Sequence, residues 1–215
     1  MRLRNIPGAQ ETVAAHELCY DGGEKPLAGT WSEIFGNDHP IYLEIGMGKG
    51  KFLTTLAELH PERNYVGIEM FDSVLVRALQ KVDGREDPLY NIRFLRMNAE
   101  DLCSMFAPGE VAHIYLNFSD PWPKDRHAKR RLTSTRYLER YDNVLAPDGQ
   151  IEFKTDNREL FGFSLEQAEE AGWDLVACTC DLHYDDTMNE GNVMTEYEER
   201  FTREGKPIYK MIIER

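Results

Sequence analysis

The sequence contains no apolar run long enough to cross a membrane, which would need about 20 consecutive apolar residues. The segment Met1–Pro7 also has no apolar stretch of the kind found in signal peptides. These two features lead us to expect a cytoplasmic protein that does not bind a membrane.

Cysteine is scarce and is not arranged for metal binding. None of the four cysteines, Cys19, Cys103, Cys178 and Cys180, forms a Cys-x-x-Cys pair, and the histidines are scattered. The common structural zinc motifs are thereby excluded, and we expect reduced thiols and no metal.

Positive charge is in deficit over the whole chain, which has a net charge of −13. Residues 124–140 are the exception, with seven Lys or Arg against two Asp or Glu, whereas the other residues hold 18 against 36. An acidic body with one basic strip would confine a polyanion to that strip.

The basic strip follows an unusual motif. An expected strand, His113–Phe118, ends just before Pro121 and Pro123, which cannot donate hydrogen bonds to a sheet. Asp120 and Trp122 lie at this break, and five cations come next: Lys124, Arg126, Lys129, Arg130 and Arg131. Because ligands bind outside the carboxyl ends of strands in open α/β sheets, the motif favours a site for a polyanion that carries a ring. The alternative is a plain turn in which Trp122 packs on the core and the cations are solvated.

The order of the expected elements predicts a Rossmann-like α/β domain. Seven expected strands alternate with helices, at 41–45, 64–70, 91–97, 113–118, 150–155, 173–182 and 207–213. Only a short helix separates the last two, which predicts one antiparallel strand, and we expect a polar loop at 184–193. At 215 residues the chain fits one domain at 41–215, preceded by a partly flexible N-terminal extension at 1–40.

A glycine turn follows the first strand, with the sequence Glu44-Ile-Gly46-Met-Gly48-Lys-Gly50. The dinucleotide fingerprint needs a small residue where Lys51 stands, and a phosphate-binding loop needs Ser or Thr where Phe52 stands. The remaining pattern, Glu-x-Gly-x-Gly-x-Gly, is that of S-adenosylmethionine (SAM) sites. A turn without a ligand is the alternative.

Two later strand ends carry residues suited to a nucleoside. Glu69, near the end of the second strand, can accept both hydroxyls of a ribose. Asn98 follows the third strand and either bonds an adenine edge or only caps the next helix. Likewise, Thr195-Glu-Tyr-Glu198 has the spacing of a helix-capping box.

Taken together, the segments Tyr42–Gly50, Tyr65–Met70, Asn117–Arg131, Phe153–Asn157 and Thr195–Glu198 resemble bacterial tRNA (guanine-N7)-methyltransferases of the TrmB type. The long Asp-Pro-Trp run is the most specific part of this resemblance, whereas the glycine turn indicates only a SAM-dependent enzyme. The resemblance implies a class I SAM-dependent methyltransferase with a seven-stranded, mostly parallel sheet that has one antiparallel strand and helices on both faces.

The resemblance also implies roles for individual residues. Asp120 would be the catalytic residue. Contacts with SAM would come from Glu44, Gly46, Gly48, Glu69, Asn98, Ala99 and Asp120. The RNA substrate would be bound by Lys124, Asp156, Thr195, Glu196, Tyr197 and Glu198. The tRNA backbone would meet Arg126, His127, Lys129, Arg130 and Arg131. Many relatives have Asp in place of Asn98, which leaves adenine bonding plausible but removes a charge.

The implied reaction is methyl transfer from SAM to N7 of the guanine at position 46, in the variable loop of tRNA. Guanine N7 has a lone pair and no proton, so we expect Asp120 to orient the reactants and to favour the cationic product rather than to act as a base. We expect Asp156 and Glu198 to accept hydrogen bonds from guanine N1 and N2. Trp122 either stacks on the base or only shapes the pocket. Relatives occur as monomers and as homodimers.

Three other functions are compatible with parts of the pattern. A DNA or protein N-methyltransferase is disfavoured by the basic run and by the lack of a target-recognition domain. An NAD-dependent oxidoreductase is disfavoured by Lys51. A non-catalytic RNA-binding module is disfavoured by the intact Asp120 and glycine turn.

Overall fold

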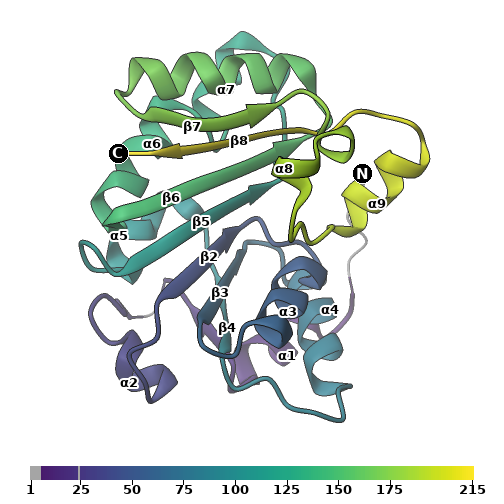
Figure 1. Ribbon diagram of the computed structural model, residues 1–215. Helices are drawn as coiled ribbons and strands as arrows, with labels where there is room; N and C mark the ends of the chain where they lie inside the picture. Colours follow the sequence, from purple (N-terminus) through teal and green to yellow (C-terminus); the bar gives the residue numbers. More distant parts are fainter. Residues whose placement is uncertain (1–5, 24) are drawn as a thin grey trace.

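A computed structural model describes residues 6–23 and 25–215, and its central feature is a twisted sheet (Figure 1). In this part of the chain the sheet has eight strands in the order β1-β4-β3-β2-β5-β6-β8-β7. Strand β8 is antiparallel to both of its neighbours, and the other pairs are parallel. The strands are β1 (Cys19–Asp21), β2 (Ile41–Ile45), β3 (Asn64–Glu69), β4 (Ile92–Arg96), β5 (Val111–Asn117), β6 (Leu145–Thr155), β7 (Asp174–Thr179) and β8 (Tyr209–Glu214).

The expected seven strands are all present with one antiparallel strand, but the count of seven is wrong by one. The additional strand is β1, which pairs with β4 in the register Cys19 to Phe94. A strand of only three residues is too short to show an alternating pattern, so β1 cannot be predicted from the sequence. It lies in the segment expected as an N-terminal extension, of which residues 1–5 and Glu24 lie outside the described part.

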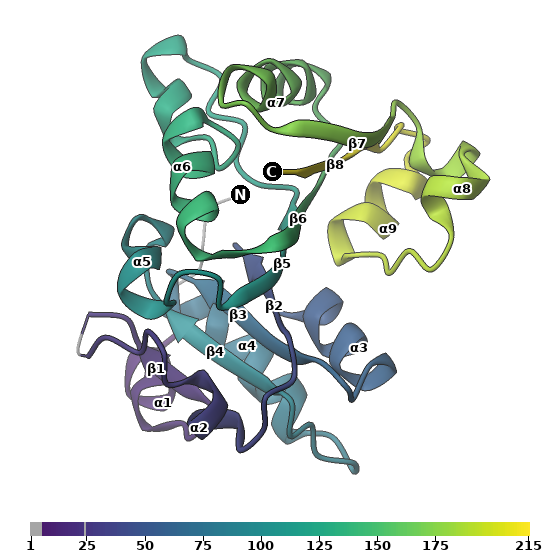
Figure 2. The ribbon, with the colours of Figure 1, turned by 60° about the vertical axis from the view of Figure 1, so that its left-hand side comes forward.

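Helices cover both faces of the sheet (Figure 2). Helices α1, α3 and α4 contribute to one buried apolar cluster, and α2, α5, α6 and α7 contribute to the other. Figure 2 shows α5 and α6 on the opposite side of the sheet from α3. The bounds are α1 (Ala9–Ala15), α2 (Trp31–Phe35), α3 (Lys51–Leu59), α4 (Asp72–Asp83), α5 (Leu102–Met105), α6 (Thr135–Val144) and α7 (Arg158–Glu170).

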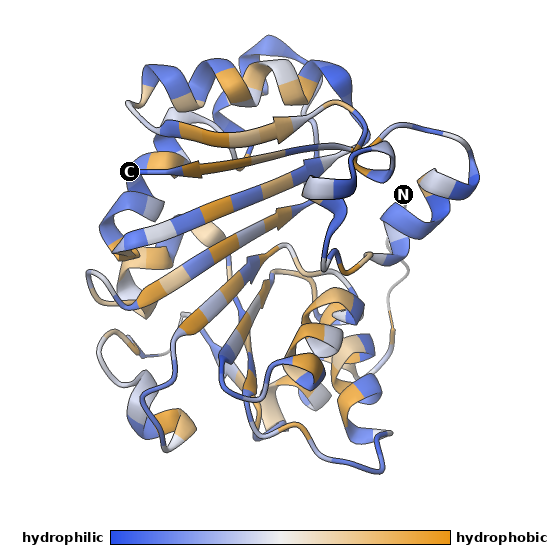
Figure 3. Cartoon of the chain, viewed as in Figure 1, coloured by the Kyte–Doolittle hydropathy of each residue, from blue (hydrophilic) through white to orange (hydrophobic). Residues whose placement is uncertain are grey.

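The apolar pattern of the chain explains how these layers pack. Hydrophobic and hydrophilic residues alternate along β5 and β6 in Figure 3, and the apolar ones, such as Ile114, Ile151 and Phe153, are buried in the core. The N-terminal segment joins the same core: Trp31 is buried, its Nε1 donates to the carbonyl of Met105 at 2.7 Å, and its ring stacks on Phe106. Residues 6–40 therefore contribute both a strand and core side chains to the domain.

A segment between β7 and β8 lies at the carboxyl ends of β5 and β6 (Figure 1). It comprises α8 (Asp186–Asn189), α9 (Glu196–Arg203) and a short 3₁₀ turn (Leu182–Tyr184), and we call residues 182–206 the cap segment. The loop expected at 184–193 thus contains a helical turn, in which Asp185 accepts from the Met188 N–H. No helix in the described ranges is long and apolar enough to span a membrane.

Candidate active site

The glycine turn after β2 forms an open backbone cradle. Gly46 and Gly48 have φ angles of 75° and 59°, a left-handed conformation that favours glycine. The N–H groups of Gly46 and Met47 both donate to the carbonyl of Ile68, which fixes the turn against β3. A Cβ atom built on Gly46 or Gly48 would meet nothing within 4 Å. The turn therefore leaves space in which a ligand can approach the backbone.

Glu69 closes this cradle from the end of β3. One carboxylate oxygen accepts from the Gly48 N–H at 3.2 Å and the other from the Phe71 N–H at 3.1 Å. Burial raises the pKa of Glu69, and the charge of Asp120 adds to that rise. Each carboxylate oxygen has further lone pairs, so Glu69 can brace the turn and still accept from a ligand hydroxyl.

Glu44 lies at the bottom of the site with an unsatisfied oxygen. Its Oε1 accepts from Asn117 Nδ2 at 2.9 Å, while its Oε2 has no partner among the described residues. Burial raises the pKa of Glu44 to about 8. Asn117 Oδ1 and Ser119 Oγ, at the end of β5, are also buried without partners in that part of the chain. Buried polar atoms are usually paired, so this group of atoms is suited to a polar ligand.

The loop after β5 presents Asp120 on a strained backbone. Phe118 and Trp122 have φ angles of 51° and 42°, which residues other than glycine rarely adopt. The Phe118 N–H donates to the carbonyl of Lys154 at 2.8 Å, and Asp120 lies exposed between the two strained residues. Strain of this kind persists where the surrounding structure enforces it, often at functional sites.

Trp122 packs within its own loop. Arg130 lies over its ring at 5.0 Å, and the His127 ring meets it edge-on. Arg131 donates to the carbonyls of Pro121 and Trp122, and its guanidinium lies over the Phe163 ring. Of the two sequence alternatives for Trp122, these contacts favour shaping of the pocket over stacking on a base. Arg130 and Arg131 hold the loop as well as adding charge.

The remaining cations of the motif face solvent. Lys124, Arg126 and Lys129 are exposed, and within the described ranges none of them forms an ion pair. Residues 125–130 form a 3₁₀ helix, so the strip is an ordered surface next to Asp120. Charges that are not already paired are available to neutralise a phosphate backbone.

Helix α9 is capped and anchored by residues of the expected substrate-binding segment. The Thr195 hydroxyl accepts from the Glu198 N–H at 3.0 Å, which confirms the capping interpretation of this spacing. Glu196 pairs with Lys81 and Glu199 with Lys51, which joins α9 to α4 and α3. The α9 helix therefore lies against the elements that form the cradle.

The structure does not support the expected contact of Glu198 with guanine. This side chain has no exposed surface, and its Oε2 accepts from Lys154 Nζ at 2.7 Å. Its Oε1 accepts from Asn192 Nδ2 at 2.7 Å. Because the Glu198 carboxylate has no exposed surface, a base cannot reach it in this arrangement of the cap segment.

An aromatic surface lies beside the anchored helix. The Tyr197 ring stacks on Phe118, and both rings contact Phe201. Tyr197 is 43% exposed, so part of its ring faces solvent. Asp156, at the end of β6, accepts from Lys206 at 3.2 Å, and Lys206 also lies over the Phe201 ring. An acid and an aromatic surface are thereby brought close together.

Asn98 adopts the capping role that the sequence left open. Its Oδ1 accepts from the Glu100 N–H at 3.1 Å at the start of the Ala99–Asp101 turn. Ala99 is buried, whereas Asn98 is exposed, so its Nδ2 is accessible to a ligand.

Comparisons with known proteins agree with this geometry. A family model described as "Putative methyltransferase" matches residues 38–211. A protein from Lachnoclostridium phytofermentans named tRNA (guanine-N(7)-)-methyltransferase is 54% identical, over 99% of this chain and 97% of its own. A protein of the same name from Bacillus subtilis is 45% identical, over 100% and 99%. The chain belongs to the tRNA (guanine-N(7)-)-methyltransferase family.

Solved structures show the fold of this methyltransferase family member. The crystal structure of the 16S rRNA methyltransferase KamB aligns with a TM-score of 0.64 and 16% identity, over 86% of this chain and 93% of that one. An antibiotic-related methyltransferase aligns with a TM-score of 0.63 and 17% identity, over 85% and 91%. At these identities the likeness shows a shared methyltransferase fold.

Sequence reasoning missed three residues of the site in this methyltransferase. Asn117 and Phe118 lie at the end of the apolar run 113–118, which carries no chemical signal for either residue. Lys154 lies between two buried residues, Phe153 and Thr155, in a strand covered on both faces. A lysine in such a position requires a buried partner, and this is the signal that would have identified it.

Proposed function

We propose that this enzyme transfers a methyl group from SAM to N7 of the guanine at position 46, in the variable loop of tRNA. The observation that carries the proposal is the convergence at one sheet edge of the open glycine cradle, the exposed Asp120 and the free cations of residues 124–129. The names of relatives that match nearly the whole chain support methylation of guanine N7 in tRNA.

The donor set fits SAM. Glu44 Oε2, which has no partner among the described residues, suits the amino group of the methionine part. Glu69 suits the ribose hydroxyls, and the Gly46–Gly48 turn leaves the space that the cofactor needs. We assign Asn98 Nδ2 and the Ala99 backbone to the adenine side. When bound, SAM supplies an activated methyl group on a sulfonium.

Asp120 is the catalytic residue in this proposal. Guanine N7 has a lone pair and no proton, so no residue has to act as a base. The positive charge that arrives on the purine is stabilised by a fixed carboxylate in the site. The strained residues on either side hold the Asp120 backbone in place, and such positioning is worth up to about 7–11 kcal/mol in favourable cases.

The target base is held by residues from three parts of the chain: α9, the loop after β5 and the end of β6. We place the guanine on the ring surface of Tyr197 and Phe118, because base–aromatic stacking contributes about 1–3 kcal/mol per base. Asp156 accepts from guanine N1 and N2, and adenine has no such pair of donors. Thr195 and Glu196 act here by capping and docking α9 rather than by touching the base.

The tRNA backbone is bound by the basic strip. Lys124 lies nearest to Asp120 in the chain and is assigned to the substrate phosphate next to the target base. Arg126 and Lys129 extend the contact. His127 and Arg130 pack on the Trp122 ring, and Arg131 donates to the Pro121 carbonyl, so these three residues stabilise the loop. The reaction needs no metal, because the sulfonium is already an activated donor. We place it in the cytoplasm, with the protein as a monomer or a homodimer.

One assay tests the proposal. The protein is incubated with methyl-labelled SAM and an unmodified tRNA transcript, and the RNA is digested to nucleosides. Label in 7-methylguanosine is the expected result, and a transcript with adenine at position 46 should receive none. Asp120→Asn is the matched protein control. Label in another nucleoside, or equal label in the adenine transcript, would contradict the assignment.

A further inference from the structure

Lys154 is a buried lysine whose side-chain hydrogen bonds all reach the cap segment. It lies on the central strand β6, and its side chain has no exposed surface. Its Nζ donates to Glu198 Oε2 at 2.7 Å, to Asn192 Oδ1 at 3.0 Å and to the Val193 carbonyl at 3.0 Å. An ammonium group has three donors, so all of them are used within this one segment.

Glu198 has a matching set of partners. Besides Lys154, it accepts from Asn192 Nδ2, and His183 Nε2 lies 3.3 Å from its Oε1. Burying two charges away from water costs free energy. Mutating only one member of a buried pair is strongly destabilising, because it leaves the other charge buried without a partner. The outer pairs of α9, with Lys51 and Lys81, are partly exposed and contribute less. The buried pair is therefore the principal polar link between the sheet and the cap segment.

The same lysine connects the two halves of the aromatic surface. Its backbone carbonyl accepts the N–H of Phe118, on the loop after β5. Its side chain binds Glu198, the residue directly after Tyr197 on α9. Phe118 and Tyr197 come from different elements, and their rings stack. Lys154 thus bonds to both parts of the chain that must stay aligned for the rings to meet.

We propose that Lys154 is a positioning residue that fixes the cap segment on the sheet, so that Tyr197 and Phe118 form a single surface for the target base. Glu198 acts through this pair and not by touching the guanine. The role of the surface in base binding rests on the proposed function, whereas the attachment of the cap segment does not.

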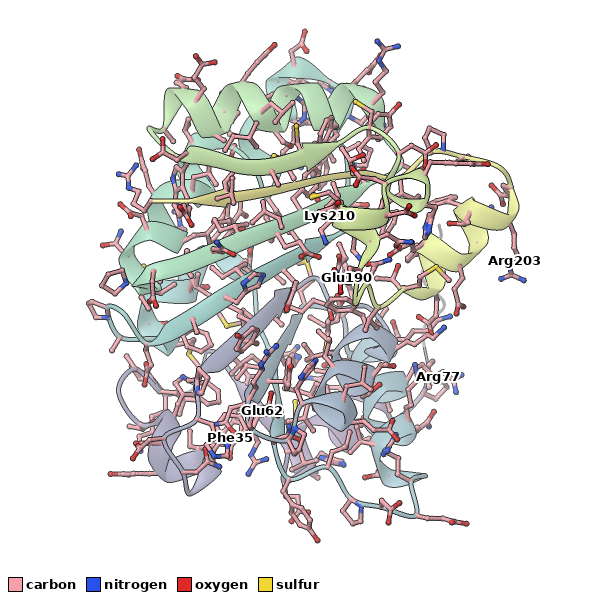
Figure 4. All side chains as sticks on the ribbon, in the orientation of Figure 1. Phe35, Glu62, Arg77, Glu190, Arg203 and Lys210 are labelled. Carbon is pink, nitrogen blue, oxygen red and sulfur yellow. The ribbon has the colours of Figure 1, made fainter. Side chains whose placement is uncertain are left out.

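Hydrogen exchange tests the attachment in the protein alone, without SAM or tRNA. Lys154→Met should lower the protection of amides in residues 195–203 at least tenfold more than that of β3 and β5. Lys210→Met is the matched control: Lys210 is the cross-strand partner of Lys154 and is also buried, but it pairs with Glu152 and donates to the Met188 carbonyl on α8, so its bonds do not reach α9. It is labelled beside the cap segment in Figure 4. Equal protection of α9 in wild type and Lys154→Met would overturn the proposal. This outcome does not depend on which substrate the enzyme methylates.

Kinetics then separates positioning from direct contact. We expect Lys154→Met to raise the KM for tRNA at least tenfold and to leave the Kd for SAM within about threefold. The double variant Lys154→Met with Glu198→Gln should be no worse than Lys154→Met alone, because both changes break the same pair. If the two losses multiply, Glu198 touches the substrate and the proposal is wrong.

If Lys154→Met fails to fold, the Glu198→Gln variant alone tests the positioning role of the buried pair. It keeps the shape of the side chain and its Oε1 acceptor for Asn192, but it removes the charge opposite Lys154. Faster exchange in residues 195–203 together with a raised KM for tRNA supports the proposal. Unchanged exchange with a lowered kcat overturns it.

Discussion

Replacing Glu44 by Gln should stabilise the free enzyme, increasingly so as the pH rises. Glu44 is buried, its Oε2 has no partner in the described chain, and burial raises its pKa from 4.5 to about 8. At ~1.4 kcal/mol per pKa unit, the ionised carboxylate destabilises the folded state by about 5 kcal/mol. The residue is almost fully buried, so solvent screening does not reduce this value much.

The sign follows from linkage. A carboxyl group whose pKa is raised on folding favours the folded state fully only below pH 4.5, and that stability is lost as the pH rises toward 8. Gln does not titrate. The free energy of unfolding of Glu44→Gln, relative to wild type, should therefore increase by about 4 kcal/mol between roughly pH 5 and pH 8.5.

Urea unfolding of both proteins without SAM at these two pH values measures the difference. A constant difference would refute the assignment of Glu44 as a buried, destabilised carboxylate. SAM binding provides a second readout, because pairing with the cofactor's amino group needs the ionised form. Near neutral pH, calorimetry in two buffers of different ionisation enthalpy should detect a released proton in wild type, and Glu44→Gln should not release it.

The other predictions concern turnover, tRNA affinity and the cradle. Asp120→Asn should lower kcat by about 10²–10³ with tRNA Kd nearly unchanged, as measured by single-turnover methylation and filter binding; lost tRNA binding would argue against its catalytic role. Lys124→Ala with Arg126→Ala should weaken tRNA binding and lower the salt slope by about one per phosphate contact; an unchanged slope would exclude them from the interface. Gly46→Ala should abolish SAM binding at a stability cost of about 1–2 kcal/mol. Gly67→Ala should mainly lower stability, because its Cβ would come 2.2 Å from Met47 Sδ.

The sequence was most informative where a function requires a particular local pattern. The glycine turn with Glu44, and Glu69 at the next strand end, identified the cradle, because the residues that form it are adjacent in sequence or follow consecutive strands. The strand end at Asp120 was identified for the same reason. Such features depend on local chemistry and on the sheet rule that places carboxyl ends at one edge.

What the sequence did not reveal depends on contacts between distant segments. The pairing of Lys154 with Glu198 spans 44 positions, and nothing in either neighbourhood indicates the other residue. For that reason the sequence alone predicts Glu198 as a substrate ligand, whereas the structure buries its carboxylate against Lys154. The stacking of Arg130 on Trp122 was likewise hidden, since a charge run and an aromatic residue give no orientation.

The distribution of paired and unpaired lysines explains how an acidic protein can select one surface for RNA. The first turn of α9 has three acids, Glu196, Glu198 and Glu199, and each pairs with a lysine of a different element. Those lysines cannot also neutralise phosphates. Exposed cations without an ion pair among the described residues lie on the strip that follows Asp120 in the chain, while the rest of the chain has a net negative charge that repels a polyanion. Internal pairing around α9 thus leaves the basic strip as the favoured path by which a phosphate backbone approaches the methyl-transfer site.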